Sequence, residues 1–444
     1  MMDITRRQAG FGMGALAAAG LVGRTAAAAI PEASVPPLTL AVEKGASLRV
    51  LRPAKFVEPD EAIFRENTKK FADATGVQIR IDVSGWEDLR PQTAVTANTG
   101  AGPDVVVGFT DDPHLYADKL VDLSDVAGYL GKKYGGWYPL AEKYGKRNGT
   151  EQWIAIPLGA SGGLALYRKS WLGEVGFNAF PATLDGFLDM SRKLHKSGHP
   201  VGFALGHAVG DANAYCHWLV WAHGGTMTDA AGKVTINSKE TVEALKYGKA
   251  LYETFVPGTN SWLDPSNNKA MLAGEISVTQ NGVSLYYSAK NSPDPQIAKI
   301  GQDMDHAHMP VGPVGKVMEG ALAINAMIFK HSKYPNAAKA YLAYMMEAPQ
   351  YDKWLTGSFG YWGQPLKAYE GSEVWNGDPK IKLYKDTMAN GVYYAYPGSI
   401  SEQSGAVMAD YVMVDMVAAA STGASTPEDA AKEAERRAKR YFRA

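Results

Sequence analysis

The sequence contains a single cysteine, Cys216, among its 444 residues. One cysteine cannot form a disulfide within the chain, so no internal crosslink holds the fold together. An excess of charge of one sign is also missing, because 45 lysine and arginine residues face 46 aspartate and glutamate residues. This balance argues against a nucleic-acid-binding surface and against an acidic tail. Beyond the N-terminal segment we find no internal repeat and no low-complexity region.

The length predicts two or three domains, each large enough to bury a hydrophobic core. Aromatic residues make up 10% of the chain, including 10 tryptophans and 23 tyrosines. This content is compatible with aromatic platforms on which sugar rings stack, although most such rings fill cores.

The N-terminus has the features of an export signal. A twin arginine at Arg6 and Arg7 precedes a Gly/Ala-rich apolar run over 10–21 and small residues over 26–29. The run is too short to span a bilayer, so we predict that residues 1–29 are a cleaved signal of twin-arginine type. Export by the Sec route stays open, because Ala9 stands where a phenylalanine usually follows the arginine pair. No cysteine follows the signal, which predicts a protein that is soluble in the periplasm without a lipid anchor.

The first third of the mature chain alternates strands and helices. A strand begins at Ser47, a helix follows from Glu58 to Gly76, and apolar and polar residues then alternate over 77–83. A second helix is predicted over 88–98, and the aliphatic run at 105–107 is typical of a buried parallel strand. This rhythm predicts a parallel sheet with right-handed crossovers.

Residues 153–177 favour a passage from one lobe to another. An apolar run stops at Pro157, which suits a sheet edge, and Gly-Ala-Ser-Gly-Gly follows at 159–163. Glycine gives the backbone the freedom that a hinge needs, and Leu164 then restarts a strand.

This passage, continued by Pro-Ala-Thr-Leu-Asp-Gly-Phe at 181–187, resembles the crossover of bacterial extracellular solute-binding proteins of the sugar-binding type. Gly-Pro-Asp-Val-Val-Val at 102–107 and the Gly-Glu pair at 274–275 match the same family in layout. The resemblance covers nearly all of the mature chain. It implies a two-lobed α/β fold in which each lobe is a mostly parallel sheet flanked by helices, with a ligand cleft between the lobes.

The resemblance also implies the domain limits and the partners. We expect an N-terminal lobe over 38–157 plus 318–348 and a C-terminal lobe over 158–317 plus 349–444. The expected role is that of a monomeric binding protein, not an enzyme, that delivers a small molecule to an inner-membrane ABC permease. We expect no cofactor, no metal and no nucleic-acid partner.

Ligands of open α/β sheets bind beyond the carboxyl ends of the strands, so we take candidate residues from the loops there. Phe109, Asp111, Asn281 and Tyr286 are candidates because they match positions at which the family binds ligand. Trp86, Glu87, Asn213 and Tyr215 follow predicted strands, and Ser161 and Glu319 lie in the crossings. Further candidates are Tyr361, Trp362, Tyr394 and Glu402.

These residue types favour a sugar, an oligosaccharide or another polyol. A sugar ring stacks on tryptophan or tyrosine, and its hydroxyl groups bond to carboxylates and amides. Arginines are scarce in the candidate loops, which argues against an anionic ligand. A cationic amine held by aromatic faces and acids stays open as an alternative.

Two further motifs offer other chemistry. Gly159 to Gly163 fits Gly-x-Ser-x-Gly, the nucleophile elbow of hydrolases, which would make Ser161 a catalytic serine. Residues 303–308 read Asp-Met-Asp-His-Ala-His, the ligand types of a zinc or copper site but without a regular spacing. We expect a hinge and a solvated loop, respectively.

Overall fold

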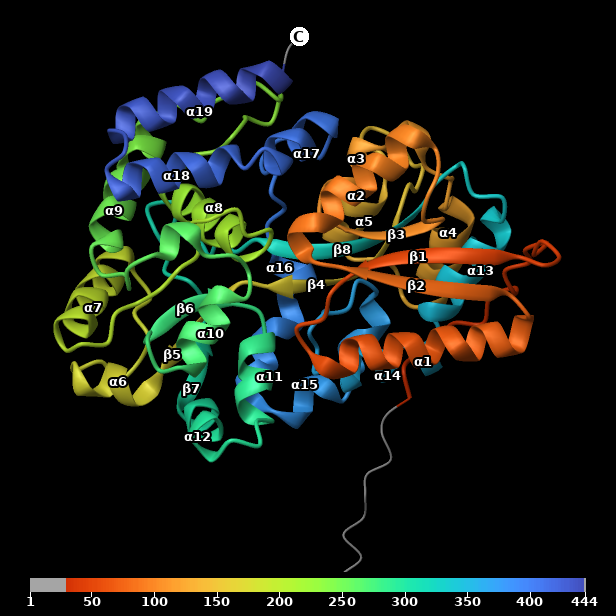
Figure 1. The fold of residues 1–444 in the computed structure, drawn as a ribbon, viewed down its shortest axis with the longest axis horizontal. Coiled ribbons are helices and arrows are strands. Elements are labelled where there is room, and N and C mark those ends of the chain that lie inside the picture. Colours follow the sequence, from red (N-terminus) through yellow and green to blue (C-terminus); the bar gives the residue numbers. More distant parts are fainter. Residues whose placement is uncertain (1–28, 443–444) are drawn as a thin grey trace, which may run out of the picture.

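In the computed structural model, which describes residues 29–442, the chain forms two halves, each built on its own sheet (Figure 1). The first sheet has five strands in the order β2-β1-β3-β8-β4, and the second has three in the order β6-β5-β7. The strands are β1 (Ser47–Pro53), β2 (Gln78–Ser84), β3 (Val105–Phe109), β4 (Ile156–Gly162), β5 (Leu164–Arg168), β6 (Val278–Asn281), β7 (Met304–Ala307) and β8 (Ala321–Ile328).

The first sheet begins with the predicted parallel strands. β1 pairs in parallel with both β2 and β3, and the connecting helices are α1 (Glu58–Thr75) and α2 (Trp86–Thr99). Gly76 ends α1 in the left-handed conformation at φ 76°, as the sequence predicts. Every residue of β3 is buried, whereas β2 alternates in exposure because it lies at the sheet edge. Figure 1 shows α1 on one face of this sheet and α2 on the other.

The chain leaves the first sheet and returns to it. β8 lies antiparallel between β3 and β4, and β4 continues through Gly163 into β5 of the second sheet. The predicted loose hinge over 159–163 is thus mostly strand, with a register shift between Pro157 and Gly159. β7 leads back to β8 through residues 308–320. The two halves are therefore connected at two places, between β4 and β5 and between β7 and β8.

The second sheet differs from the expected mostly parallel arrangement. β5 pairs antiparallel with both β6 and β7, because each of these strands returns toward the crossing from which β5 starts. The apolar run over 201–205 forms only one bridge, between Val201 and Phe255, although Gly202 N–H also donates to Val278 O at 2.9 Å. An apolar run of this length marks burial but does not distinguish a strand from a buried loop.

Helices surround the second sheet and form a second hydrophobic core. The helices around this core include α7 (Leu184–Lys196), α8 (Asp211–His223), α9 (Lys239–Tyr252), α18 (Val412–Thr422) and α19 (Pro427–Tyr441). The side chains of Thr183, Ser238 and Thr426 cap α7, α9 and α19, as the sequence indicates.

The predicted lobe boundary at 348/349 differs from the observed packing. The helix α13 (Pro335–Met345) begins after Tyr334 with Pro335 in its first turn. The next helix, α14 (Ala348–Gly357), packs against α1, and Trp354 Nε1 donates to Asp60 O at 3.0 Å. This helix therefore packs with the first sheet, whereas the predicted boundary at 349 assigns it to the other lobe.

Within residues 29–442, no helix combines the length and the apolar character that crossing a membrane requires. Nearly all of the predicted export signal, residues 1–28, lies outside the described part of the chain.

Candidate functional site

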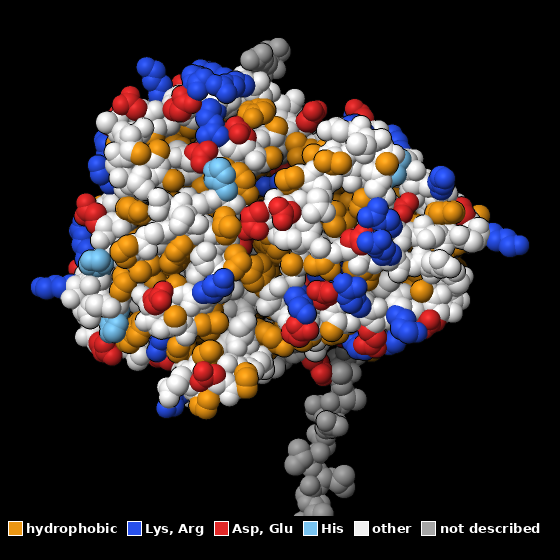
Figure 2. All heavy atoms as spheres, viewed as in Figure 1, with side chains coloured by type: hydrophobic (Ala, Val, Ile, Leu, Met, Phe, Trp, Pro, Cys, Tyr) orange, Lys and Arg blue, Asp and Glu red, His pale blue; other side chains and the backbone are white. Residues whose placement is uncertain are grey.

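A cleft lies between the two halves, and both halves contribute to its walls. Phe56, Trp86 and Leu322 reach it from the first sheet, where they follow β1, begin α2 and lie in β8. The other lining residues include two carboxylates, two amides and three hydroxyl groups: Asp211, Asp264, Asn268, Asn281, Ser161, Ser284 and Tyr361, together with Gly282. In Figure 2, acidic and hydrophobic side chains lie close together where the halves meet.

Trp86 is the centre of the aromatic wall. Phe56 meets it edge-on with ring centroids 4.9 Å apart, and Phe109 packs behind it at 4.8 Å. Trp362 stacks nearly parallel to it at 6.2 Å and an interplanar angle of 20°. The indole N–H of Trp86 donates to Ala54 O at 2.8 Å, which fixes the orientation of the Trp86 ring. The wall thus presents a rigid ring at the cleft, as stacking on a sugar face requires.

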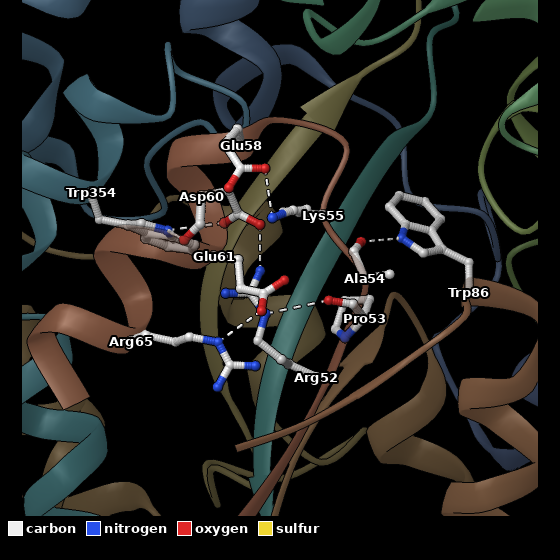
Figure 3. Close-up of polar contacts among 10 residues, drawn as sticks. All are labelled: Arg52, Pro53, Ala54, Lys55, Glu58, Asp60, Glu61, Arg65, Trp86 and Trp354. Carbon is white, nitrogen blue, oxygen red and sulfur yellow. Dashed lines mark hydrogen bonds and ion pairs between the residues drawn. The ribbon is translucent and has the colours of Figure 1, made fainter. Parts of the chain in front are cut away.

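A buried ion pair holds the loop that carries this wall (Figure 3). Arg52, at the end of β1, donates to Asp60 in α1, and the two residues are only 3% and 1% exposed. Trp354 Nε1 also donates to Asp60 Oδ1 at 2.9 Å, and Arg52 Nε donates to Pro53 O at 3.3 Å. Burial raises the pKa of Asp60, and Arg52 acts in the opposite direction. The ion pair therefore anchors the turn after β1, which contains Ala54 and Phe56.

The opposite wall is organised by Asp264. Its carboxylate accepts the backbone N–H groups of Val209, Gly210 and Asp211 at 2.8, 2.9 and 2.8 Å, at the start of α8. Burial raises the pKa of Asp264 to about 6, although these hydrogen bonds lower it. Burial, followed by the charge of Asp264, also raises the pKa of Asp211 well above its usual range.

Two polar groups in the cleft lack a partner within the described chain. The Ser161 hydroxyl lines the cleft in a residue only 8% exposed, and the Tyr361 hydroxyl lines it in a residue 4% exposed. The amides next to them are satisfied, since Asn281 Nδ2 donates to Asn268 Oδ1 and Ser284 Oγ donates to Asn281 Oδ1 at 3.3 Å. Both hydroxyls line the cleft without an internal partner, so they are available to bond to a polar ligand.

The halves approach each other closely at the cleft. A Cβ added to Gly210 would lie 3.3 Å from Trp86 Cζ3 and 3.0 Å from Leu322 Cδ2, both in the first half. A Cβ on Gly282 would lie 2.3 Å from Ser161 Oγ. The free volume that remains is about 30 Å³. The two halves are therefore in contact across the cleft.

The contact at Gly210 makes a testable prediction. We expect Gly210→Val to hold the halves apart and to weaken ligand binding at least tenfold, because the added side chain would occupy the space of Trp86 and Leu322. Small-angle scattering should show a larger radius of gyration at an unchanged helix content. Gly173→Ala is the control, since nothing lies within 4 Å of the added Cβ. An unchanged radius and affinity in Gly210→Val would contradict the expectation.

The structure brings several predicted residues together. Trp86, Ser161, Asn281 and Tyr361 line the cleft, and Phe109 and Trp362 support Trp86 from behind. Glu87 follows Trp86 in α2, where its Oε1 is buried without a partner and its charge raises the pKa of Asp264.

Other predicted residues lie elsewhere. Tyr215 is buried in the second core, where it stacks on Phe203 at 4.8 Å. Tyr286 packs in the first core and donates to Asp378 at 2.8 Å. Glu319 accepts from Met309 N–H at 2.6 Å and from His308, and it lines a separate groove of about 250 Å³ with Gly162. Glu402 is exposed at the start of α17 (Glu402–Ala409).

The predicted residues Asp111, Asn213 and Tyr394 lie at or next to a second contact between the halves. Asp111, 1% exposed, follows β3 and accepts from Ser404 Oγ of α17 at 2.8 Å. Ser404, Asn213 and Tyr394 line a cavity of about 20 Å³ next to this contact. Burial raises the pKa of Asp111 to about 7, and the neighbouring Asp112 adds to the increase.

The raised pKa predicts how stability depends on pH. Because Asp111 has a higher pKa in the fold than in the unfolded chain, its contribution is full at low pH and is lost as pH rises through about 7. We expect the free energy of unfolding to fall as pH rises from the ordinary value of 3.8 to about 7 and to level off above that, and Asp111→Asn to reduce this slope. The neighbouring titratable and charged groups are Asp112, Arg90, Tyr144 and Tyr394. Urea unfolding at four pH values measures the slope, and an identical slope in both proteins would contradict the assignment.

The predicted candidates do not include seven of the cleft-lining residues: Phe56, Asp211, Asp264, Asn268, Gly282, Ser284 and Leu322. Asp211 stands in the loop that provided Asn213, and only its place at the start of α8 turns it to the cleft. Asp264 follows no strand, and its role depends on N–H groups more than 50 residues away. No local pattern could have identified it.

The two other motifs also have structural explanations. The residues after Ser161 continue as the strands β4 and β5, so the strand-turn-helix geometry of a nucleophile elbow is absent. Asp303 bonds to Arg168 at 2.7 Å, His306 is buried, and His308 pairs with Glu319 at 3.0 Å. Among residues 29–442, no three acidic, histidine or cysteine side chains are grouped as a metal site would require.

Comparison with known proteins identifies the family. The family model of bacterial extracellular solute-binding proteins matches residues 66–383, and the chain belongs to this family. A probable ABC transporter-binding protein of Deinococcus radiodurans is 28% identical over 210 residues, which are 44% of this chain and 48% of that protein. The match therefore spans about half the length of this curated relative.

Solved structures confirm the predicted fold class. A solute-binding protein of Thermotoga lettingae bound with α-D-tagatose has a TM-score of 0.75 at 19% identity, over 90% of this chain and 100% of that chain. A sugar transporter protein of Arthrobacter chlorophenolicus with bound laminaribiose has a TM-score of 0.77 at 16% identity, over 89% and 99%. These likenesses show that the chain has the two-lobed fold of solute-binding proteins.

Proposed function

We propose that this protein is the substrate-binding component of an ABC importer and that it captures a sugar, an oligosaccharide or another polyol in the cleft between its halves. The observation that carries the proposal is the pairing of a fixed indole, Trp86, with the unpartnered hydroxyls of Ser161 and Tyr361 in one cleft. A polyol has an apolar face for the ring and hydroxyl groups for the polar side chains. The tagatose and laminaribiose bound to proteins of the same fold support this ligand class.

The proposed mechanism is closure of two lobes over the solute. The first lobe comprises 38–157 and 318–348, to which the pairing of β4 adds residues 158–162. The packing of α14 and the bridges of Gly363 and Leu366 extend it to residue 366, and the second lobe comprises 163–317 and the rest of the chain. The strands β4–β5 and β7–β8 are the connections about which the lobes move. A solute favours the closed form only by binding it more tightly than the open form.

The setting follows from the same role. We propose that the protein works as a monomer in the periplasm after removal of an export signal, with an inner-membrane permease as its partner. It acts by binding and not by catalysis, so an active-site serine probe should leave Ser161 unlabelled. Labelling of Ser161 would favour the alternative of a hydrolase.

The experiment is a thermal-shift screen of monosaccharides, disaccharides and sugar alcohols, followed by small-angle scattering with each compound that binds. We expect at least one compound to raise the melting temperature and to reduce the radius of gyration. Ser161→Ala should weaken its binding, because one hydroxyl partner is lost. If no sugar or polyol binds, or if binding leaves the radius unchanged, the proposal fails.

A further inference from the structure

The cleft is lined by acidic side chains and by no basic one. Its lining includes the carboxyls of Asp211 and Asp264, and it includes no lysine, arginine or histidine. Glu87 stands beside Trp86 and acts on Asp264 through its charge. Three acids thus converge on one small space between the halves.

No basic side chain of the described chain pairs with any of these acids. The nearby Arg90 is engaged by Asp112, with Arg90 Nε and Asp112 Oδ1 2.7 Å apart and both side chains largely buried. Lys55, on the loop that carries Phe56, pairs with the exposed Glu58 at 2.5 Å (Figure 3). A carboxylate removed from water without a cation is strongly unfavourable, so a positive charge from the ligand would stabilise the closed cleft.

The start of α8 offers an anion fewer donors than a free helix N-terminus does. A helix N-terminus binds anions through free backbone N–H groups, and α8 begins in this cleft. Asp264 already accepts the N–H groups of residues 209–211, so the helix start has none of these donors left for a ligand.

The aromatic wall is placed to complement the acids. The position of a Cβ on Gly210 lies 3.3 Å from Trp86 Cζ3 and 3.1 Å from Asp264 Oδ1, so indole and carboxylate approach one point from opposite halves. A cation between an indole and a carboxylate gains from both the ring quadrupole and the charge.

The hydroxyl groups of the cleft add an independent requirement. Ser161 and Tyr361 are more than nine-tenths buried and unpartnered, and they line the same space as Asp211. They call for a ligand with its own hydroxyl groups. We propose that the solute is a polyhydroxylated amine, an amino sugar or an amino polyol, whose ammonium group pairs with Asp211. This inference rests on the proposed function and narrows its ligand class.

An amine and a neutral polyol differ in what they do to the proton on Asp211. Burial and Asp264 raise the pKa of Asp211, and an ammonium group would favour its ionised form, so binding an amine releases a proton from the acid. A neutral polyol brings no charge that would favour this release. The other titratable groups around Asp211 are Asp264, Glu87, Tyr361, Tyr384 and Tyr394.

Matched ligand pairs test the inference by calorimetry: glucosamine against glucose, and 1-amino-1-deoxysorbitol against sorbitol, each at pH 6 and pH 8. We expect the amine of at least one pair to bind tenfold or more tightly at pH 8, and Asp211→Asn to reduce this preference to less than threefold. Asp88→Asn, which removes an exposed acid from the same turn of α2 as Glu87, is the control and should keep the preference.

The outcomes separate the inference from the proposed function. The amine assignment is overturned if a neutral compound binds as tightly as its amine or more tightly, or if Asp211→Asn leaves the preference for the amine intact. The proposed function still stands in that case if a neutral polyol binds and reduces the radius of gyration. Absence of binding by all four compounds also overturns the amine assignment, and the wider sugar screen then decides on the proposed function separately.

Discussion

Asp60→Asn is expected to lower the free energy of unfolding by about 3–5 kcal/mol, because it leaves the buried guanidinium of Arg52 without its anion. Arginine cannot lose its charge in a protein, so the unpaired cation has no escape by deprotonation. The substitution preserves the size of the side chain, and its amide oxygen can still accept from Trp354 Nε1, so the loss reports on the ion pair. Urea unfolding at neutral pH measures it.

The same helix offers a matched control. Glu61 pairs with Arg65 at 2.7 Å, but Arg65 is 45% exposed, and such surface pairs contribute less than about 1 kcal/mol. Glu61→Gln should therefore change stability little. Arg52→Met combined with Asp60→Leu should recover much of the loss, because it leaves neither charge buried. Equal effects of Asp60→Asn and Glu61→Gln would show that the pair does not anchor the loop.

Trp86→Ala is expected to weaken solute binding about a hundredfold, which corresponds to about 2.7 kcal/mol. Trp86 is the ring on which three other aromatic side chains converge at the cleft, and buried tryptophans of this kind dominate binding energies. The measurement is calorimetry with the compound that the thermal-shift screen identifies, at a temperature where the variant is folded by circular dichroism.

A second tryptophan serves as the control. Trp171 stacks on His199 at 4.0 Å in the other half of the molecule, outside the cleft lining. Trp171→Ala should keep the affinity within threefold, and Trp86→Phe should retain part of it because a stacking face remains. An affinity that Trp86→Ala leaves unchanged would remove the indole from the site.

The parallel half of the first sheet could be predicted because its signals are local. Alternation over 77–83 and the aliphatic run at 105–107 determine which faces are buried, and Gly76 ends its helix through its own backbone. The direction of the strands in the second sheet could not be predicted, because β5 finds β6 and β7 through contacts more than 100 residues apart in the chain.

The site was predictable to a similar extent. Trp86 and Asn281 reach the cleft because they follow β2 and end β6, a position that the sequence indicates. Tyr215 and Tyr286 satisfy similar criteria but are buried in cores, since an aromatic ring after a strand packs inside as readily as it faces a cleft. Asp264 acts only through the folded contact with α8.

The most direct test of the account is the distance between the two halves with and without solute, measured by electron resonance between spin labels. Labels at Asp88→Cys and Lys269→Cys occupy exposed helical positions on either side of the cleft, and the native Cys216 is fully buried. The account predicts a distance distribution that shortens and narrows when a bound sugar, polyol or amino polyol saturates the protein, and a loss of this change in Trp86→Ala. A distribution that stays the same while calorimetry shows binding would contradict closure of the halves over the solute.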